Sequence, residues 1–330
     1  MPFANSAIWN SDMNPLVIAG PDFSNVPNVE VDGKHLRQVL TAHAAWLDNK
    51  PAASRAELND GIFNELKLLN VRLAKANLRR SHWIGADLSG SDLSNALLEY
   101  ADFKAAKLVQ TDFSTADLSG VNFELAALGY SNLSECTLTG VSFRKANMEG
   151  ARLLEAKVHE GEFSGTELKS TGWHHARLFS CNFNEANANE ALFYHARIQF
   201  CRFAQTALVG TNFSNATIQD SEFRNSDLTN SKFNRADLSR TKFTDSQLER
   251  ADFREARLPS ASFYRSKLEG ARFAGANCYT ADFRGANMKG AKEVSTEMLS
   301  QSRTDAETIL PNGGRGPYCK GSGAERPTSR

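Results

Sequence analysis

Three basic residues in the middle of this 330-residue chain recur at intervals of twenty: Lys157, Arg177 and Arg197. Aromatic and imidazole side chains surround them in the sequence, namely His174, His175, Phe179, Tyr194, His195 and Phe200. Cations interspersed with exposed rings are typical of a surface that binds an acidic or aromatic partner. A fold that brings residues twenty apart together would therefore create a binding surface here.

The same interval separates residues that could carry other chemistry. Glu155, His175 and His195 are residue types that bind metal ions, and they are twenty apart. Cys181 and Cys201 are also twenty apart and would reach each other for a disulfide if that interval stacks them. Exposed imidazoles on neighbouring strands are more often incidental than ligands, so we expect no metal and no cofactor. In a reducing compartment we expect two buried thiols.

Composition narrows the class of protein. Lys plus Arg and Asp plus Glu both total 38, so no overall charge favours nucleic acid or an anionic membrane. No apolar run is long enough for a bilayer, and the N-terminus lacks the pattern of a signal peptide, which predicts a cytoplasmic chain with no membrane partner. No phosphate loop, nucleophile elbow, paired-histidine metal motif or dinucleotide fingerprint occurs, so we expect no enzyme.

The element that must position these residues is a five-residue repeat. From Leu58 to Met288 nearly every fifth position holds a large residue, usually Leu or Phe, with Ala188 as the undersized exception. From Ala76 onward a small residue usually precedes it by two. A polar residue usually separates the two, as in a short strand with its small and large residues inward. The other two residues of each five must then turn the chain, so each repeat forms one side of a polygon.

Stretches such as "ADLSG", "ANMEG" and "ADFRGANMKG" resemble the pentapeptide-repeat family. The resemblance covers about Ala56 to Ala291, roughly 70% of the chain, without a break in frame. It implies an all-β fold, a right-handed quadrilateral parallel β-helix with four repeats per coil and about twelve coils. Phe prefers positions ending in 3 and Leu those ending in 8, so Phe is expected on opposite walls.

The repeat also divides the chain into regions. We expect an irregular arm over 1–30, an N-terminal capping helix and linker over 31–55, and the β-helix over 56–292. A short C-terminal capping helix is expected over 293–310, with Ser295 or Thr296 as its N-cap, and a disordered tail over 311–330. Members of the family pair through their C-terminal ends, which implies a homodimer through the apolar Met298, Leu299, Ile309 and Leu310.

With four repeats per coil, residues twenty apart stack in neighbouring coils. Lys157, Arg177 and Arg197 then form a column of like charges, which is unfavourable unless an anionic partner offsets it. The resemblance places Phe179 and Phe200 on the same wall as these cations. His174, His175, Tyr194 and His195 lie on the preceding wall. These nine residues are the predicted partner-binding site.

The function that these features favour is a non-catalytic protein-interaction scaffold whose partner is not identified by the sequence. Two alternatives stay open. Some family members mimic DNA and bind gyrase or topoisomerase IV, which would make the partner a type II topoisomerase; here residues 81–190 have 15 acidic and 8 basic side chains, but 191–290 have 10 and 15. A secreted effector or its accessory would carry targeting information in residues 1–30. Direct binding of nucleic acid is not expected.

Overall fold

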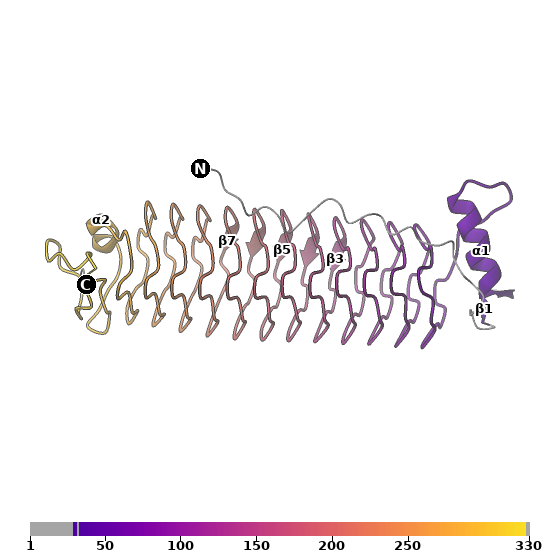
Figure 1. The fold of residues 1–330 in the computed structure, drawn as a ribbon, viewed down its shortest axis with the longest axis horizontal. Helices are drawn as coiled ribbons and strands as arrows, with labels where there is room; N and C mark the ends of the chain where they lie inside the picture. The colour runs from indigo at the N-terminus through magenta and orange to yellow at the C-terminus, as the bar shows by residue number, and fades with distance from the viewer. Residues whose placement is uncertain (1–28, 32, 328–330) are drawn as a thin grey trace.

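The computed structural model describes residues 29–31 and 33–327. These residues form a long rod of stacked coils, with helix α1 (Leu36–Leu47) at one end and helix α2 (Thr296–Ser300) at the other (Figure 1). The all-β parallel solenoid expected from the five-residue repeat is confirmed. No helix within the described ranges is long and apolar enough to cross a membrane.

The bridge residues of the rod pair with the residues twenty positions later. Parallel bridges at this interval run from Glu57↔Asn77 to Arg272↔Lys292. Backbone hydrogen bonds run in both directions between neighbouring coils. The Phe63 N–H donates to the His82 carbonyl (2.7 Å), and the His82 N–H donates to the Gly61 carbonyl (2.8 Å). At twenty residues per coil, 56–292 corresponds to about twelve coils, each about 4.8 Å from the next.

On most faces of the rod, neighbouring coils are joined by isolated β-bridges of one residue each, but one face carries a regular sheet. Its strands are β3 (Thr137–Thr139), β4 (Lys157–His159), β5 (Arg177–Phe179), β6 (Arg197–Gln199) and β7 (Thr217–Gln219). They are parallel, in the order β3-β4-β5-β6-β7. We call this side of the coils the sheet face; it lies in the middle of the rod (Figure 1).

The small and large residues of the repeat point inward, as predicted. The phenylalanine rings stack from coil to coil, with ring centroids 4.5 Å apart for Phe163 and Phe183 and 4.7 Å for Phe183 and Phe203. A second column stacks in the same way and meets the first edge to face, as Phe183 does with Phe193. All of these rings are buried. The rod is therefore filled along its length, and only outward side chains are available for recognition.

The N-terminal end of the rod is covered by α1, whose Leu36, Leu40 and His43 are buried against the first coil. His43 Nδ1 accepts a hydrogen bond from the Ala56 N–H (3.1 Å). The side chain thus satisfies a backbone donor of the first coil, which has no preceding coil to pair with. A hairpin of β1 (Glu30–Val31) and β2 (Lys34–His35) precedes the helix and was not predicted. The predicted arm lies outside the described residues, apart from positions 29 and 30.

Acidification should weaken this cap. Burial lowers the pKa of His43 below its ordinary value of 6.5, and the charges of Arg72 and Arg55 act in the same direction. Below pH 6.5 the unfolded chain therefore takes up a proton that the folded cap resists, so stability falls as the pH drops. We expect exchange of the Ala56 amide to accelerate between pH 7.5 and 5.5 relative to the central coils. His43→Gln, which keeps an acceptor but cannot titrate, should lose this pH dependence; equal pH dependence in both proteins would contradict the prediction.

The C-terminal end differs from expectation. The helix spans Thr296–Ser300 and not 293–310, with the Ser295 hydroxyl accepting from the Met298 N–H (3.0 Å). After this helix the chain resumes the parallel bridges between coils, as the pairing of Asn287 with Ile309 shows. Apolar side chains that suggested a homodimer are instead buried in this cap, namely Met298, Leu299 and Leu310. The dimer stays a prediction, and these three buried side chains do not provide a surface for it.

The tail predicted to be disordered is folded in its described part. Turns tie residues 311–327 to the cap: the Leu310 N–H donates to the Gly314 carbonyl (2.8 Å) and the Asn312 N–H to the Ala324 carbonyl (3.2 Å). Ala324 is buried. Gly313 uses its conformational freedom for a tight turn at φ +86°.

Candidate interaction surface

The sheet face brings the three predicted cations into adjacent strands. Lys157 of β4 pairs with Arg177 of β5, which pairs with Arg197 of β6. All three side chains are exposed, and none of them forms an ion pair within residues 29–31 and 33–327. We call these residues the cation ladder. Like charges in directly opposed positions destabilise a sheet by roughly 0.2–1 kcal/mol per pair.

Basic residues elsewhere on the rod often find a carboxylate in the next coil. Arg80 contacts Asp60 at 2.6 Å and Arg240 contacts Asp220 at 2.6 Å, in both cases twenty residues away. Arg235 and Glu255 form the same kind of pair at 3.0 Å. The fold can therefore neutralise cations in its columns, and it does not do so at the cation ladder. The ladder has charge available for a partner.

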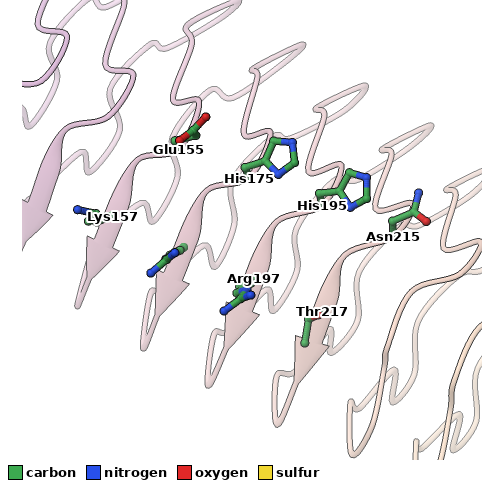
Figure 2. Close-up of a pocket in the computed structure, with 8 residues that line it drawn as sticks. Glu155, Lys157, His175, His195, Arg197, Asn215 and Thr217 are labelled. Atoms are coloured by element: carbon green, nitrogen blue, oxygen red, sulfur yellow. The ribbon is translucent and has the colours of Figure 1, made fainter.

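A groove of about 510 Å³ runs along the rod beside the cation ladder (Figure 2). One edge consists of corner residues that precede the sheet face: Glu155, His175, His195 and Asn215. The other edge is formed by the ladder and Thr217. Figure 2 shows the two rows parallel to each other over four successive coils. The carboxylate of Glu155 lies at one end, so the part of the groove lined by Arg177 and Arg197 is the more cationic one.

His175 and His195 occupy turn positions with left-handed backbone, at φ +59° and +58°. Their rings stack with centroids 5.1 Å apart and planes 6° from parallel. This arrangement turns ring faces toward each other and does not direct two ring nitrogens at one ion. Among the described residues, no group of three potential ligands could hold a metal. The described residues therefore give no support to a metal site at Glu155, His175 and His195.

Aromatic rings flank the groove on both sides. On the sheet face Phe179 meets Phe200 edge to face at 5.2 Å, and His159 stacks on Phe179 at 5.1 Å. On the other side, beside His175 and His195, the ring of Tyr194 meets that of His195 edge to face, with ring centroids 4.2 Å apart. Phe179 and Phe200 are 40% and 51% exposed, which is unusual for large apolar rings on a polar surface. His159 was missed by the sequence analysis, although the twenty-residue interval to Phe179 would have found it.

The structure thus gathers all nine residues of the predicted site. His174 is the one with an unsatisfied atom: its Nδ1 is buried and has no hydrogen-bond partner within the described chain. Burial lowers the pKa of His174, and the nearby His175 and His195 act in the same direction, so the ring is neutral at pH 7. Leaving a buried polar atom unpaired costs about 1–3 kcal/mol.

His174 lines a second, smaller depression on the face that precedes the sheet face. Its other residues are Arg152, Leu154 and Gly172, its volume is about 370 Å³, and we call it the Gly172 notch. Gly172 occupies an outward position of the repeat, where the neighbouring coils carry Arg152 and Leu192. None of these residues except His174 was predicted, because a missing side chain in an outward column gives no periodic signal.

The two stacked cysteines are free thiols. Cys181 and Cys201 are buried, and the Cys181 N–H donates to Cys201 Sγ at 3.4 Å. Burial raises the pKa of the Cys201 thiol, which keeps it protonated and unreactive at neutral pH. They fill inward small positions of the repeat.

A filled rod with a periodic backbone of stacked coils defines a β-solenoid repeat protein. Models of the pentapeptide repeat region match residues 56–133 and 176–253, and models of pentapeptide repeats match 130–169 and 261–292. The chain belongs to the pentapeptide-repeat family. Comparison with curated proteins finds no significant match.

Several solved structures share the repeat fold. HetL, a protein involved in heterocyst differentiation regulation in the cyanobacterium Nostoc sp. strain PCC 7120, is 23% identical with a TM-score of 0.38, over 80% of this chain and 95% of that chain. The plasmid-mediated fluoroquinolone resistance protein QnrB1 is 16% identical with a TM-score of 0.31, over 66% and 91%. Rfr23 from the cyanobacterium Cyanothece 51142 is 20% identical with a TM-score of 0.19, over 39% and 87%. These likenesses concern the fold alone.

Proposed function

We propose that the protein is a non-catalytic scaffold that binds an anionic protein partner through the cation ladder and the rings beside it. The observation that carries this proposal is the run of three stacked cations without an ion pair among the described residues, in a rod where other arginines, such as Arg80 and Arg240, contact a carboxylate of an adjacent coil. An anionic partner would relieve the repulsion within the ladder and gain contact with exposed aromatic rings. The groove between the two rows would position that partner along the rod axis.

A DNA mimic that binds a type II topoisomerase would need a continuous acidic face, since DNA carries one phosphate charge per about 1.7 Å of its axis. Cations interrupt the acidic half of this rod, and several outward carboxylates are already paired with arginines, as Asp60 is with Arg80. The scaffold is therefore the better supported function. The targeting information required by the effector alternative would lie in residues 1–30, almost all outside the described residues.

Substituting the ladder tests the proposal. Arg177→Gln with Arg197→Gln should leave the melting temperature unchanged or slightly higher, because it removes like-charge contacts. The same variant should capture its partner at least tenfold less well at low salt, and the remaining binding should depend less on salt. The measurement is quantitative affinity capture with the full chain at several salt concentrations.

The matched control is Arg224→Gln with Arg257→Gln. Both arginines are exposed and form no ion pair with the part of the chain that the structure describes, and they lie in separate coils. The control removes the same charge and should keep full capture. Equal capture by all three proteins would refute the proposed site. Inhibition of a purified type II topoisomerase by wild type and ladder variant alike would favour the DNA mimic instead.

A further inference from the structure

The Gly172 notch has a property that the fold does not explain. Among the outward positions ending in 2 or 7 from 57 to 292, Gly172 is the one glycine. Its backbone does not adopt the left-handed conformation that favours glycine. A Cβ atom added there would meet Leu154 Cδ1 at 3.7 Å and His174 Nδ1 at 3.8 Å, which are ordinary contacts. A Cβ atom fits at this position, so the backbone does not require glycine, and the missing side chain leaves a gap in the outward column between Arg152 and Leu192.

The notch suits an apolar side chain with a polar group beside it. Leu154 and the bare Gly172 backbone give it an apolar lining, and Leu154 is 37% exposed. The His174 ring forms part of its wall, with Nδ1 buried and without a hydrogen-bond partner among the described residues. The next residue, His175, lines the groove beside the cation ladder. Notch and groove are therefore separated only by the turn that contains His174 and His175, which we call the histidine corner. One partner can therefore reach both.

The spacing of the cation ladder selects the conformation of that partner. Neighbouring coils are about 4.8 Å apart, a helix advances about 5.4 Å per turn, and an extended strand repeats one face every 6.6 Å or so. Over the two steps of the ladder, a helix along the rod axis departs from register by about 1 Å and a strand by about 4 Å. A flexible Glu side chain absorbs the first difference but not the second.

We propose that the partner segment is an acidic α-helix that lies along the histidine corner, with carboxylates from successive turns on the cation ladder and one apolar side chain in the Gly172 notch. This proposal rests on the proposed function, because it concerns the same surface. The carboxylates occupy the Arg177 and Arg197 end of the groove, away from Glu155. The aromatic rings of Tyr194 and His195 contact the helix between its acidic and apolar stripes.

A designed peptide tests the geometry. The probe is a fluorescein-labelled, alanine-rich helix of about twenty residues, with Glu on three successive turns and one Leu on the adjacent face. Binding to the full chain is measured by fluorescence anisotropy at low salt. We expect Gly172→Leu, which fills the notch, to weaken binding about tenfold or more without lowering the melting temperature. Replacing the peptide Leu by Ser should weaken binding to wild type similarly and have little effect on the Gly172→Leu variant.

Two further probes separate the outcomes. A peptide of the same composition with Glu at alternate positions should bind at least tenfold less tightly than the helical one, and so should a single-stranded oligonucleotide of equal charge. Equal binding of either, unchanged binding by Gly172→Leu, or no binding of the helix to wild type would overturn the inference. If Arg177→Gln with Arg197→Gln abolishes peptide binding while Gly172→Leu does not, the notch fails and the proposed function stands. If the ladder variant binds normally, the proposed function itself fails.

Discussion

Phe223→Asp should unfold the middle of the rod, whereas Asp227→Ala, four residues away, should lower the melting temperature by a few degrees at most. Phe223 is fully buried, and its ring stacks on Phe203 at 4.6 Å and on Phe243 at 5.2 Å. Removing such a ring costs about 3–5 kcal/mol, and burying an unpaired carboxylate adds several more. Domains are stable by only about 5–15 kcal/mol, so the sum approaches the whole stability.

Asp227 points outward, and its carboxylate accepts one hydrogen bond, from the Thr229 N–H at 3.0 Å. Losing it costs about 1 kcal/mol. Thermal unfolding followed by circular dichroism compares the two variants directly. Comparable losses from the two substitutions would contradict the inward and outward assignment that underlies every surface argument above.

Deleting twenty residues should harm the rod less than deleting five. Removal of 221–240 takes out one whole coil, so residue 241 takes over the register of residue 221 and Phe243 stacks on Phe203. The coils on either side still match, and cooperative melting should persist within a few degrees of wild type. Small-angle scattering should show a rod shorter by about 4.8 Å.

Removal of 236–240 takes out one side of one coil and rotates everything after it by one face. Phe243 then follows Ile218 in its column, and Arg235 loses its alignment with Glu255. Lost aromatic stacking, mismatched core volumes and broken ion pairs together cost several kcal/mol at the junction. We expect the five-residue deletion to lower the melting temperature by about ten degrees, although it removes only a quarter as many residues as the twenty-residue deletion. A larger loss from the twenty-residue deletion would show that the register is not the main determinant.

The interior of the rod and the side-by-side placement of the candidate-site residues could be predicted from the sequence, because both follow from one interval. Phe223 is inward because it keeps the five-residue frame, and Lys157, Arg177 and Arg197 meet because they share the twenty-residue register. The β1 and β2 hairpin could not be found, since strands of two residues leave no periodic pattern. The fold of 311–327 depends on individual turn hydrogen bonds that composition does not reveal. The Gly172 notch and the buried His174 Nδ1 depend on side-chain packing between coils.

Because the register is constant, the number of binding sites on the rod and the spacing between them can be changed in steps of one coil. The backbone hydrogen bonds that join the coils recur every twenty residues whatever the outward side chains are, so a set of outward side chains can be copied along the axis in steps of twenty residues. Writing a second set of cations at Asp237, Arg257 and Asn277 would place it in the same column as the first, four coils farther along. The two sets would be about 19 Å apart on one rigid body. A partner with two acidic segments joined by a matching spacer would then bind with avidity, and changing the spacing by one coil would retune that effect without altering either contact.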